Sequence, residues 1–248
     1  MTKRLNEKIA LITGGSRGIG RAIALAFARE GASVAINSTT HNSAAIETLR
    51  ALDEHGGPHI SVTADVSSAE QVREMTSQVI EKYGRIDILV NNAGVLSRHP
   101  FLELTPEEFQ RIHSVNVSGA FNVAHEVAKA MAEQGGGAIL NTASIASKRA
   151  YWNLAHYCSS KAALSMLTQS MALELAALKI RVNEICPGLI ETDLSDPEFR
   201  KARVDVIPLK RVGTPEDLTE AAIYLCSDNA KWVTGASIVI DGGVLITP

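Results

Sequence analysis

Short runs of apolar and β-branched residues recur along the chain, and longer segments with helical periodicity separate them. Because these short runs are nearly continuously apolar, each one predicts a strand buried on both faces of a parallel sheet. Their alternation with helices predicts an α/β fold in which helices cover both sides of that sheet. The seven predicted strands are 8–13, 32–37, 59–64, 86–91, 137–142, 180–185 and 237–240.

The helical segments carry recognisable start signals. Three of them begin with the capping sequences SSAE, TPEE and TPED, in which a hydroxyl side chain stands three positions before an acidic one. The alternative fold is an eight-stranded barrel. A barrel needs one more strand–helix unit than this chain offers, and barrels carry no phosphate-binding glycines at their start. The predicted helices begin near Gly18, Ser43, Ser67, Thr105, Val117, Tyr157 and Thr214.

The composition supports one domain over residues 1–248. With 46% hydrophobic residues, the chain is long enough to bury one large core, and it contains no repeat, linker or low-complexity segment. A net charge of -3 with scattered Lys and Arg gives no basic surface for nucleic acid, so no such partner is expected. No run approaches 18 apolar residues and the start is too short for a signal peptide, which favours a soluble, cytoplasmic protein with no membrane partner.

The three cysteines show no CxxC or Cys/His ligand spacing. An odd number of cysteines without a secretory leader favours free thiols in a reducing compartment. The histidines also lack ligand spacing, so no metal site is expected.

A glycine-rich segment, TGGSRGIG (13–20), follows the first predicted strand and opens the first helix. Glycines at this position allow a sharp turn and a close approach of the backbone to a pyrophosphate, while the helix start supplies free N–H groups. The spacing differs from the GxGxxG fingerprint. The position between a strand and a helix nevertheless favours a dinucleotide turn.

The second strand region, VAINSTTH (34–41), predicts the cofactor preference. It contains no Asp or Glu to accept hydrogen bonds from a ribose 2'-OH, and Ser38 takes a place in the predicted cofactor site. Arg17, inside the glycine turn, is suited to bind a 2'-phosphate. NADP(H) is therefore favoured and NAD(H) remains possible, because Arg17 could also be a solvated turn residue.

The sequence YCSSK (157–161) opens a long, mostly apolar helix. Tyr157 and Lys161 are four residues apart and so share one helix face. A nearby ammonium is expected to lower the pKa of the phenol below its usual value of about 10, which would make Tyr157 an acid or base near neutral pH. A surface tyrosine beside a solvated lysine is the alternative for this motif taken alone.

These motifs occur together with several others in one order along the chain: Asp65-Val66, NNAG (91–94), Asn116 in SVNVSG, Ser144 in NTASIAS, and CPGLIET (186–192). The combination resembles the short-chain dehydrogenase/reductase family, in its single-domain branch. The resemblance covers nearly the whole chain. It implies a Rossmann-type doubly wound sheet, and an enzyme that interconverts a ketone and a secondary alcohol by hydride transfer with a pyridine nucleotide.

The resemblance also implies the cofactor contacts. The phosphate turn, the adenine contacts, the central strand end and the nicotinamide segment are expected to use Gly14, Ser16, Arg17, Gly18, Ile19, Gly20, Asp65, Val66, Asn92, Ala93, Gly94, Pro187, Gly188, Ile190 and Thr192.

Four residues carry the expected chemistry. Tyr157 is expected to exchange a proton with the substrate oxygen, and Ser144, at the end of the fifth strand, to position that oxygen. By resemblance, Lys161 binds the nicotinamide ribose and Asn116 holds a water that links Lys161 to solvent.

The substrate is less well defined by the sequence. The pocket is expected to use Ser144, Ala146, Tyr151, Trp152, Tyr157 and Leu189, with a lid at about 189–213. Tyr151 and Trp152 could stack on a sugar or an aromatic ketone, or pack against another subunit. A small ketone, polyol or sugar is favoured.

The chain is also similar to the 3-oxoacyl carrier-protein reductases, as in IPLKRVGTPED (207–217). Those enzymes present basic residues to an acidic carrier protein. Here MAEQGGGAI (131–139) lacks one, whereas LKIR (178–181) keeps Lys179. A carrier-protein thioester is therefore the alternative substrate. A nucleotide-sugar epimerase would need a longer substrate domain, and a cofactor-sensing regulator would not need the catalytic residues.

The helix that begins near Tyr157 is apolar around much of its circumference, although a sheet covers only one of its faces. This pattern predicts a homo-oligomer. The family resemblance implies a tetramer.

Overall fold

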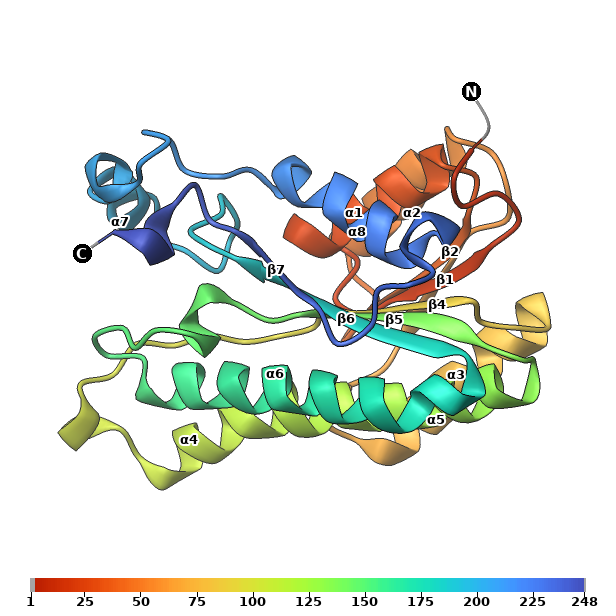
Figure 1. The fold of residues 1–248 in the computed structure, drawn as a ribbon, viewed down its shortest axis with the longest axis horizontal. Coiled ribbons are helices and arrows are strands. Elements are labelled where there is room, and N and C mark those ends of the chain that lie inside the picture. Colours follow the sequence, from red (N-terminus) through yellow and green to blue (C-terminus); the bar gives the residue numbers. More distant parts are fainter. Residues whose placement is uncertain (1–2, 248) are drawn as a thin grey trace.

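The computed structural model describes residues 3–247 as one seven-stranded parallel sheet between two layers of helices (Figure 1). The strand order is β3-β2-β1-β4-β5-β6-β7, so the chain reverses direction across the sheet between β1 and β4. All seven predicted strands and the doubly wound fold are confirmed. The strands are β1 (Ile9–Ile12), β2 (Ser33–Ser38), β3 (Ile60–Thr63), β4 (Ile88–Asn91), β5 (Gly137–Thr142), β6 (Ile180–Pro187) and β7 (Ser237–Ile240).

Helices α1 (Gly18–Arg29), α2 (Ser43–Asp53) and α8 (Thr219–Cys226) cover one face of the sheet. The opposite layer contains α3 (Ala69–Tyr83), α4 (Pro106–His113), α5 (Ala120–Glu133) and α6 (Ala155–Leu175) (Figure 1). Along β1, Ala10 and Ile12 join the core under the first layer, and Leu11 joins the core under the second. Both faces of the sheet are therefore buried, which explains why the strands lack polar alternation.

The capping residues of TPEE and TPED act as predicted, whereas in SSAE the cap is Ser68 and not Ser67. Ser68 accepts a hydrogen bond from the Gln71 N–H, and Thr105 accepts one from Glu108 N–H. Thr214 and Asp217 form a reciprocal capping box at the turn that leads into α8. Each cap pairs N–H groups that would otherwise lack a partner at a helix start.

A π-helical segment (Ser114–Gly119) joins α4 to α5, where the sequence predicted a separate helix start near Val117. The segment contains Asn116. A Cβ at Gly119 would lie 2.6 Å from the Val66 side chain, so glycine lets this segment approach the loop after β3. Such π turns widen a helix locally and often mark functional positions.

No helix within residues 3–247 is long and apolar enough to cross a membrane. Over the same residues, no group of three or more His, Cys, Asp or Glu side chains is arranged to hold a metal ion. Cys158, Cys186 and Cys226 are all free thiols, as predicted.

Candidate active site

A cavity of about 1250 Å³ opens at the carboxyl ends of the strands. The loops that follow β1, β2, β3, β4, β5 and β6 all contribute to its lining. It includes the switch point between β1 and β4, where the strand order reverses. In doubly wound folds this crevice is where ligands bind.

The glycine turn forms one wall of the cavity. Gly14 and Gly18 have φ values of 61° and 53°, which other residue types rarely adopt. A Cβ at Gly20 would lie 2.2 Å from the Gly14 carbonyl oxygen, so only glycine allows the helix to start this close to the turn. The Asn92 amide donates hydrogen bonds to the carbonyl oxygens of Thr13 and Gly14, at 3.0 and 3.1 Å, and thereby braces the turn from β4.

The structure brings nearly all the predicted cofactor residues into this cavity. Gly20 is the exception: it packs behind the turn and shapes it without lining the cavity. The predicted cofactor residues that line the cavity are Gly14, Ser16, Arg17, Gly18, Ile19, Ser38, Asp65, Val66, Asn92, Ala93, Gly94, Tyr157, Lys161, Pro187, Gly188, Ile190 and Thr192.

At the far end of the glycine turn, the exposed Arg17 side chain forms an ion pair with Asp193 at 3.4 Å. The loop after β2 adds hydroxyl and amide side chains to the same region, from Ser38, Thr39, Thr40 and Asn42, and no acidic one. Next to it, the Asp65 carboxylate accepts hydrogen bonds from the Ser67 N–H and hydroxyl. This end of the cavity therefore offers the exposed Arg17 cation and several neutral hydrogen-bonding groups.

Tyr157 and Lys161 share one face of α6 and both line the cavity, as predicted. The Lys161 ammonium lies 5.8 Å from the centre of the Tyr157 ring. It donates a 2.8 Å hydrogen bond to the Thr142 carbonyl oxygen at the end of β5. The ammonium is thus held between the strand end and the phenol.

The expected lowering of the Tyr157 pKa is wrong for the protein alone. Burial destabilises the phenolate and raises the pKa of Tyr157 to about 12, although a hydrogen bond with Ser144 acts in the opposite direction. Burial likewise lowers the pKa of Lys161 to about 8, and the nearby Glu184 carboxylate only partly opposes this change. The phenol is therefore protonated near neutral pH, which is the state that a proton donor needs.

Ser144 lies two residues beyond β5 and has an extended backbone. Its hydroxyl forms a hydrogen bond with the Tyr157 phenol. The hydroxyl also accepts a 3.1 Å hydrogen bond from the Ala146 N–H. Since the N–H fixes one lone pair, the hydroxyl proton remains available to a second acceptor. Ser144 and Tyr157 together present two O–H groups to one point of the cavity.

Asn116 lies beside this pair but does not line the cavity. Its side chain accepts from the Val95 N–H at 2.8 Å and donates to the Val95 carbonyl oxygen at 3.0 Å and to Ser160 Oγ at 3.1 Å. A Cβ at Gly94 would lie 3.3 Å from the Asn116 side-chain oxygen and 3.7 Å from the Lys161 ammonium. Asn116 thus fixes the loop after β4 against α6.

The predicted substrate residues Ser144, Ala146, Tyr151, Trp152, Tyr157 and Leu189 all line the cavity. Phe199 and Arg203 line the same end and belong to the predicted lid, whereas the sequence missed Arg98, Arg149, Val244 and Thr247. Arg98 follows the NNAG motif closely, which was a usable signal. Arg203 and the C-terminal residues reach the cavity only through the tertiary fold, as Figure 1 shows for α7 (Pro197–Lys201) and the nearby C-terminus.

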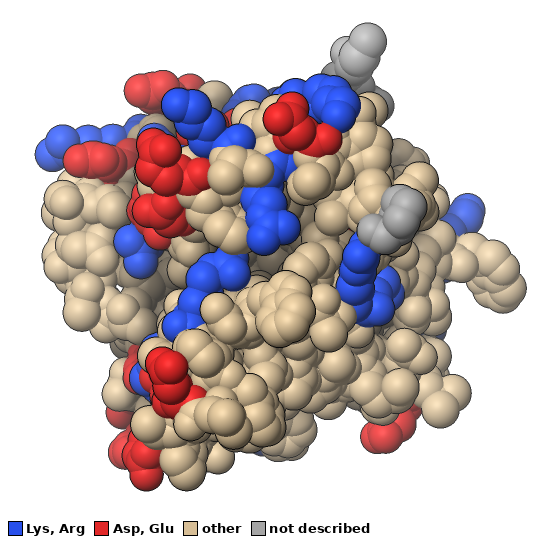
Figure 2. Space-filling view, turned by 90° about the vertical axis from the view of Figure 1, so that its left-hand side faces the viewer, with Lys and Arg blue, Asp and Glu red and all other residues tan. Residues whose placement is uncertain are grey.

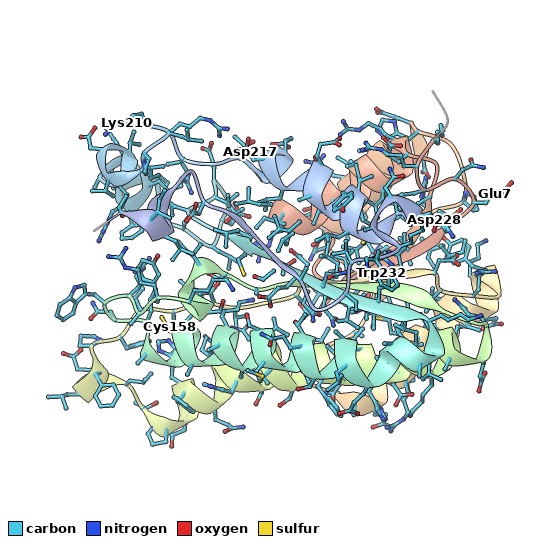
Figure 3. All side chains as sticks on the ribbon, in the orientation of Figure 1. Glu7, Cys158, Lys210, Asp217, Asp228 and Trp232 are labelled. Carbon is cyan, nitrogen blue, oxygen red and sulfur yellow. The ribbon has the colours of Figure 1, made fainter. Side chains whose placement is uncertain are left out.

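The side-chain view shows how this end is built (Figure 3). Cys158, the neighbour of Tyr157, lies at the start of α6, at the same end of the molecule as α7. Trp232 lies away from this end, near the opposite edge of the sheet (Figure 3). The catalytic motif and the segment after β6 therefore face one another.

Comparison with known proteins identifies the class. The family described as enoyl-(acyl carrier protein) reductase matches residues 14–245 of the chain. The chain therefore belongs to the short-chain dehydrogenase/reductase family, and it is an oxidoreductase that acts on alcohol and ketone groups.

Several curated relatives match along nearly their whole length. An L-rhamnose-1-dehydrogenase of Scheffersomyces stipitis is 39% identical, with 99% of each chain covered. A 7alpha-hydroxysteroid dehydrogenase of Escherichia coli is 38% identical over 97% of this chain and 95% of the relative. A 3-oxoacyl-[acyl-carrier-protein] reductase of Thermotoga maritima is 36% identical over 98% and 100%, respectively.

Two solved structures are similar in the same way. A short-chain type dehydrogenase/reductase from Mycobacterium marinum is 42% identical, with a TM-score of 0.95 and coverage of 99% of this chain and 98% of the other. A gluconate 5-dehydrogenase from Burkholderia cenocepacia, in complex with NADP and tartrate, is 34% identical, with a TM-score of 0.93 and coverage of 100% and 98%.

Proposed function

We propose that this protein is an NADP(H)-dependent oxidoreductase that interconverts a ketone and a secondary alcohol, with Tyr157 as the acid/base. One observation carries the proposal: the Tyr157 phenol, the Ser144 hydroxyl and the Lys161 ammonium converge in the cavity that the glycine turn also lines. The turn fits a dinucleotide because it is closely packed. Glycine at position 20 lets the start of α1 approach Gly14, where a Cβ would clash with the Gly14 carbonyl oxygen.

When bound at the glycine turn, a nicotinamide cofactor would provide the hydride for the carbonyl carbon, or take it from the alcohol carbon. During reduction, the Tyr157 O–H donates its proton to the substrate oxygen, and during oxidation its phenolate takes that proton back. Ser144 donates a hydrogen bond to the same oxygen and so positions it over the phenol. Lys161 stabilises the negative charge that develops on the phenolate and binds the nicotinamide ribose.

Asn116 acts one step away from the reaction. Its side chain holds the Val95 backbone on one side and Ser160, the neighbour of Lys161, on the other. In the proposed enzyme it positions a water that relays protons between Lys161 and solvent.

NADP(H) is favoured over NAD(H) by the adenosine end of the cavity. No acidic side chain in the loop 39–42 after β2 could bind a ribose 2'-OH, and Arg17 lines the same cavity as Ser38 and Thr39. The related Burkholderia cenocepacia enzyme was solved with NADP. A bound 2'-phosphate would replace the Asp193 carboxylate as the ion-pair partner of Arg17.

A small ketone, polyol or sugar is the favoured substrate. The named relatives include a sugar dehydrogenase and a hydroxysteroid dehydrogenase. The alternative, a 3-oxoacyl carrier-protein thioester, is favoured by the Thermotoga maritima relative and by the IPLKRVGTPED sequence, in which Arg211 pairs with Asp217. Segment 189–213 acts as a lid in either case.

The experiment is a substrate panel followed by NADPH oxidation. Purified protein is offered ketoses, diketones, ketosteroids and 3-oxoacyl thioesters. Each compound is assayed once with NADPH and once with NADH. Turnover of at least one ketone that is lost in Tyr157→Phe supports the proposal. Equal turnover by both proteins would refute the role of the phenol, and thioesters as the preferred substrates would select the alternative.

We also propose that the active form is a homo-oligomer, a tetramer by analogy with the family, in the cytoplasm. The outer face of the α5 and α6 layer exposes large apolar side chains, with Phe121 at 47%, Met166 at 60% and Leu173 at 82% exposure. Because exposed apolar side chains on adjacent helices favour association, a second copy of the chain is the expected partner for this face.

A further inference from the structure

Two arginines from distant parts of the chain line the cavity and lie against one aromatic ring. Arg98 comes from the loop after β4, and Arg203 follows α7. Both stack against the Phe199 ring, with guanidinium carbons 4.1 Å and 5.1 Å from its centre. Figure 2 shows the corresponding face, where Lys and Arg side chains gather beside a central hollow.

Within residues 3–247, neither guanidinium has an acidic partner. No ion pair or side-chain hydrogen bond joins Arg98 or Arg203 to a carboxylate, whereas Arg17, Arg200 and Arg211 each have one. Arg149, a third arginine in this lining, is bonded to the Thr247 carbonyl oxygen and is not part of the pair. The whole chain has a net charge of -3, so two arginines without an acidic partner are opposite in sign to its overall charge.

The pair also has an electrostatic cost. Partial burial and the positive charge of Arg203 both lower the pKa of Arg98. The contact with the Phe199 ring face offsets part of this repulsion, but it supplies no negative charge. An anion that contacts both guanidinium groups would relieve the repulsion and accept hydrogen bonds from their N–H donors.

The adenosine end of the cavity does not need these residues. The phosphate turn and Arg17 follow β1, whereas Arg98 follows the NNAG motif after β4 and Arg203 belongs to segment 189–213. Among residues 3–247, the acidic side chains in the lining are Asp65, after β3, and Asp193, which pairs with Arg17.

We infer that the substrate of this enzyme is an anion: a carbonyl compound or secondary alcohol that also bears a carboxylate. Arg98 and Arg203 bind this carboxylate, while Tyr157 and Ser144 bind the reacting oxygen. The inference rests on the proposed function, which it narrows from neutral ketones and sugars to oxo acids and hydroxy acids. Phe199 acts as the positioning residue that holds both guanidinium groups at the cavity mouth.

The test compares matched carboxylate and neutral compounds. The pairs are 5-oxogluconate with L-sorbose and 4-oxopentanoate with its amide, each assayed for NADPH oxidation and for binding by titration calorimetry to the NADP-loaded enzyme. We expect the carboxylate of a pair to have the higher kcat/KM. Arg98→Gln and Arg203→Gln should each lower that kcat/KM about tenfold or more, mainly through KM, and affect the neutral compound much less.

Arg73→Gln is the matched control, because Arg73 is an exposed arginine on α3 outside the cavity. Sugar phosphates form a second arm: a preference for them over carboxylates would assign the pair to phosphate and overturn the carboxylate. Equal kcat/KM for both members of a pair, or an equal loss for both in the variants, would also overturn the inference. So would the absence of any carboxylate binding.

The two proposals fail differently. If no compound is turned over but the carboxylate binds and this binding is lost in Arg98→Gln and Arg203→Gln, the proposed reaction is wrong and the anion site stands. If neutral compounds are turned over through Tyr157 with no preference for charge, the reaction stands and the anion site is wrong. Efficient turnover of a carrier-protein thioester that is insensitive to both arginines would likewise refute the site.

Discussion

The Lys161 ammonium lies 5.8 Å from the centre of the Tyr157 ring, and its hydrogen bond goes to the Thr142 carbonyl oxygen, not to the phenol. The relationship is therefore electrostatic and not a direct bond. Burial raises the pKa of Tyr157 to about 12, so the phenol keeps its proton, and burial lowers the pKa of Lys161 to about 8. The site is arranged to give a proton to a substrate oxygen and to stabilise the phenolate afterwards.

Tyr157→Phe removes the proton donor and leaves the ring in place. We expect kcat to fall about 10²- to 10⁴-fold, because general acid catalysis by a positioned side chain contributes about that much. NADPH binding, followed by protein fluorescence, should change little. Tyr83→Phe is the matched control, since the Tyr83 hydroxyl bonds to the Pro58 carbonyl oxygen away from the cavity. Normal turnover by Tyr157→Phe would contradict the assignment.

The pH profile of ketone reduction should reflect Lys161. The phenol stays protonated up to a pKa of about 12, but Lys161 has a pKa lowered to about 8. The charged form of Lys161 is thus present below pH 8 and is lost as the pH rises, so kcat/KM for reduction should fall above that value. Titration of the Lys161 amine by NMR in the cofactor-free enzyme provides the direct check. A profile that is flat well into the alkaline range would show that the ammonium is not required.

The sequence predicted the fold well because its strongest signal, burial of both strand faces, is local. Ala10, Leu11 and Ile12 are all apolar since the sheet is covered on both sides. The motifs were also placed correctly, because the carboxyl ends of parallel strands meet at one edge. The π-helical segment at Asn116 was missed, since its backbone depends on packing against the loops after β3 and β4.

The electrostatics of the site could not be read in the same way. The spacing of Tyr157 and Lys161 indicates proximity but not burial, and burial decides the direction of both pKa changes. Similarly, nothing in the sequence pairs Arg98 with Arg203, because they meet only through the Phe199 ring. Local motifs therefore predicted which residues form the site, and the tertiary fold determined their charge states and their distant partners.

Arg17 should determine the preference between the two nucleotides. Arg17→Ala is expected to raise KM for NADPH about ten- to a hundredfold, because hydrogen bonds to charged groups are among the stronger ones, and to leave NADH unaffected. Asp193→Asn removes the present partner of Arg17 and should lower KM for NADPH about two- to fivefold, since exposed ion pairs are weak. Arg21→Ala, one helical turn further on and outside the cavity, is the control. An unchanged NADPH to NADH ratio in Arg17→Ala would rule out this role.

Gly20→Ala should damage the nucleotide turn. Its Cβ would lie 2.2 Å from the Gly14 carbonyl oxygen and 2.5 Å from the Asn92 amide, so the turn must shift. We expect a loss of about 1–3 kcal/mol in the free energy of unfolding together with a raised KM for NADPH. Gly56→Ala is the comparison: it has a φ of 74° and open space around it, so it should lower the melting temperature without changing KM. A raised KM in both variants would show that the effect is not specific to the turn.

Leu173→Glu should weaken the proposed oligomer. Leu173 is 82% exposed on α6, within the apolar face that also includes Met166 and Phe121, and a carboxylate buried there by association would lose its hydration. Light scattering is expected to show a higher-order assembly for the wild type and a smaller species for the variant. Leu102→Glu is the matched control, since Leu102 is 96% exposed on the loop before α4, away from this face. A wild-type protein with the scattering mass of one 26.5 kDa chain would refute the oligomer, and an unchanged assembly in Leu173→Glu would place the interface on another face.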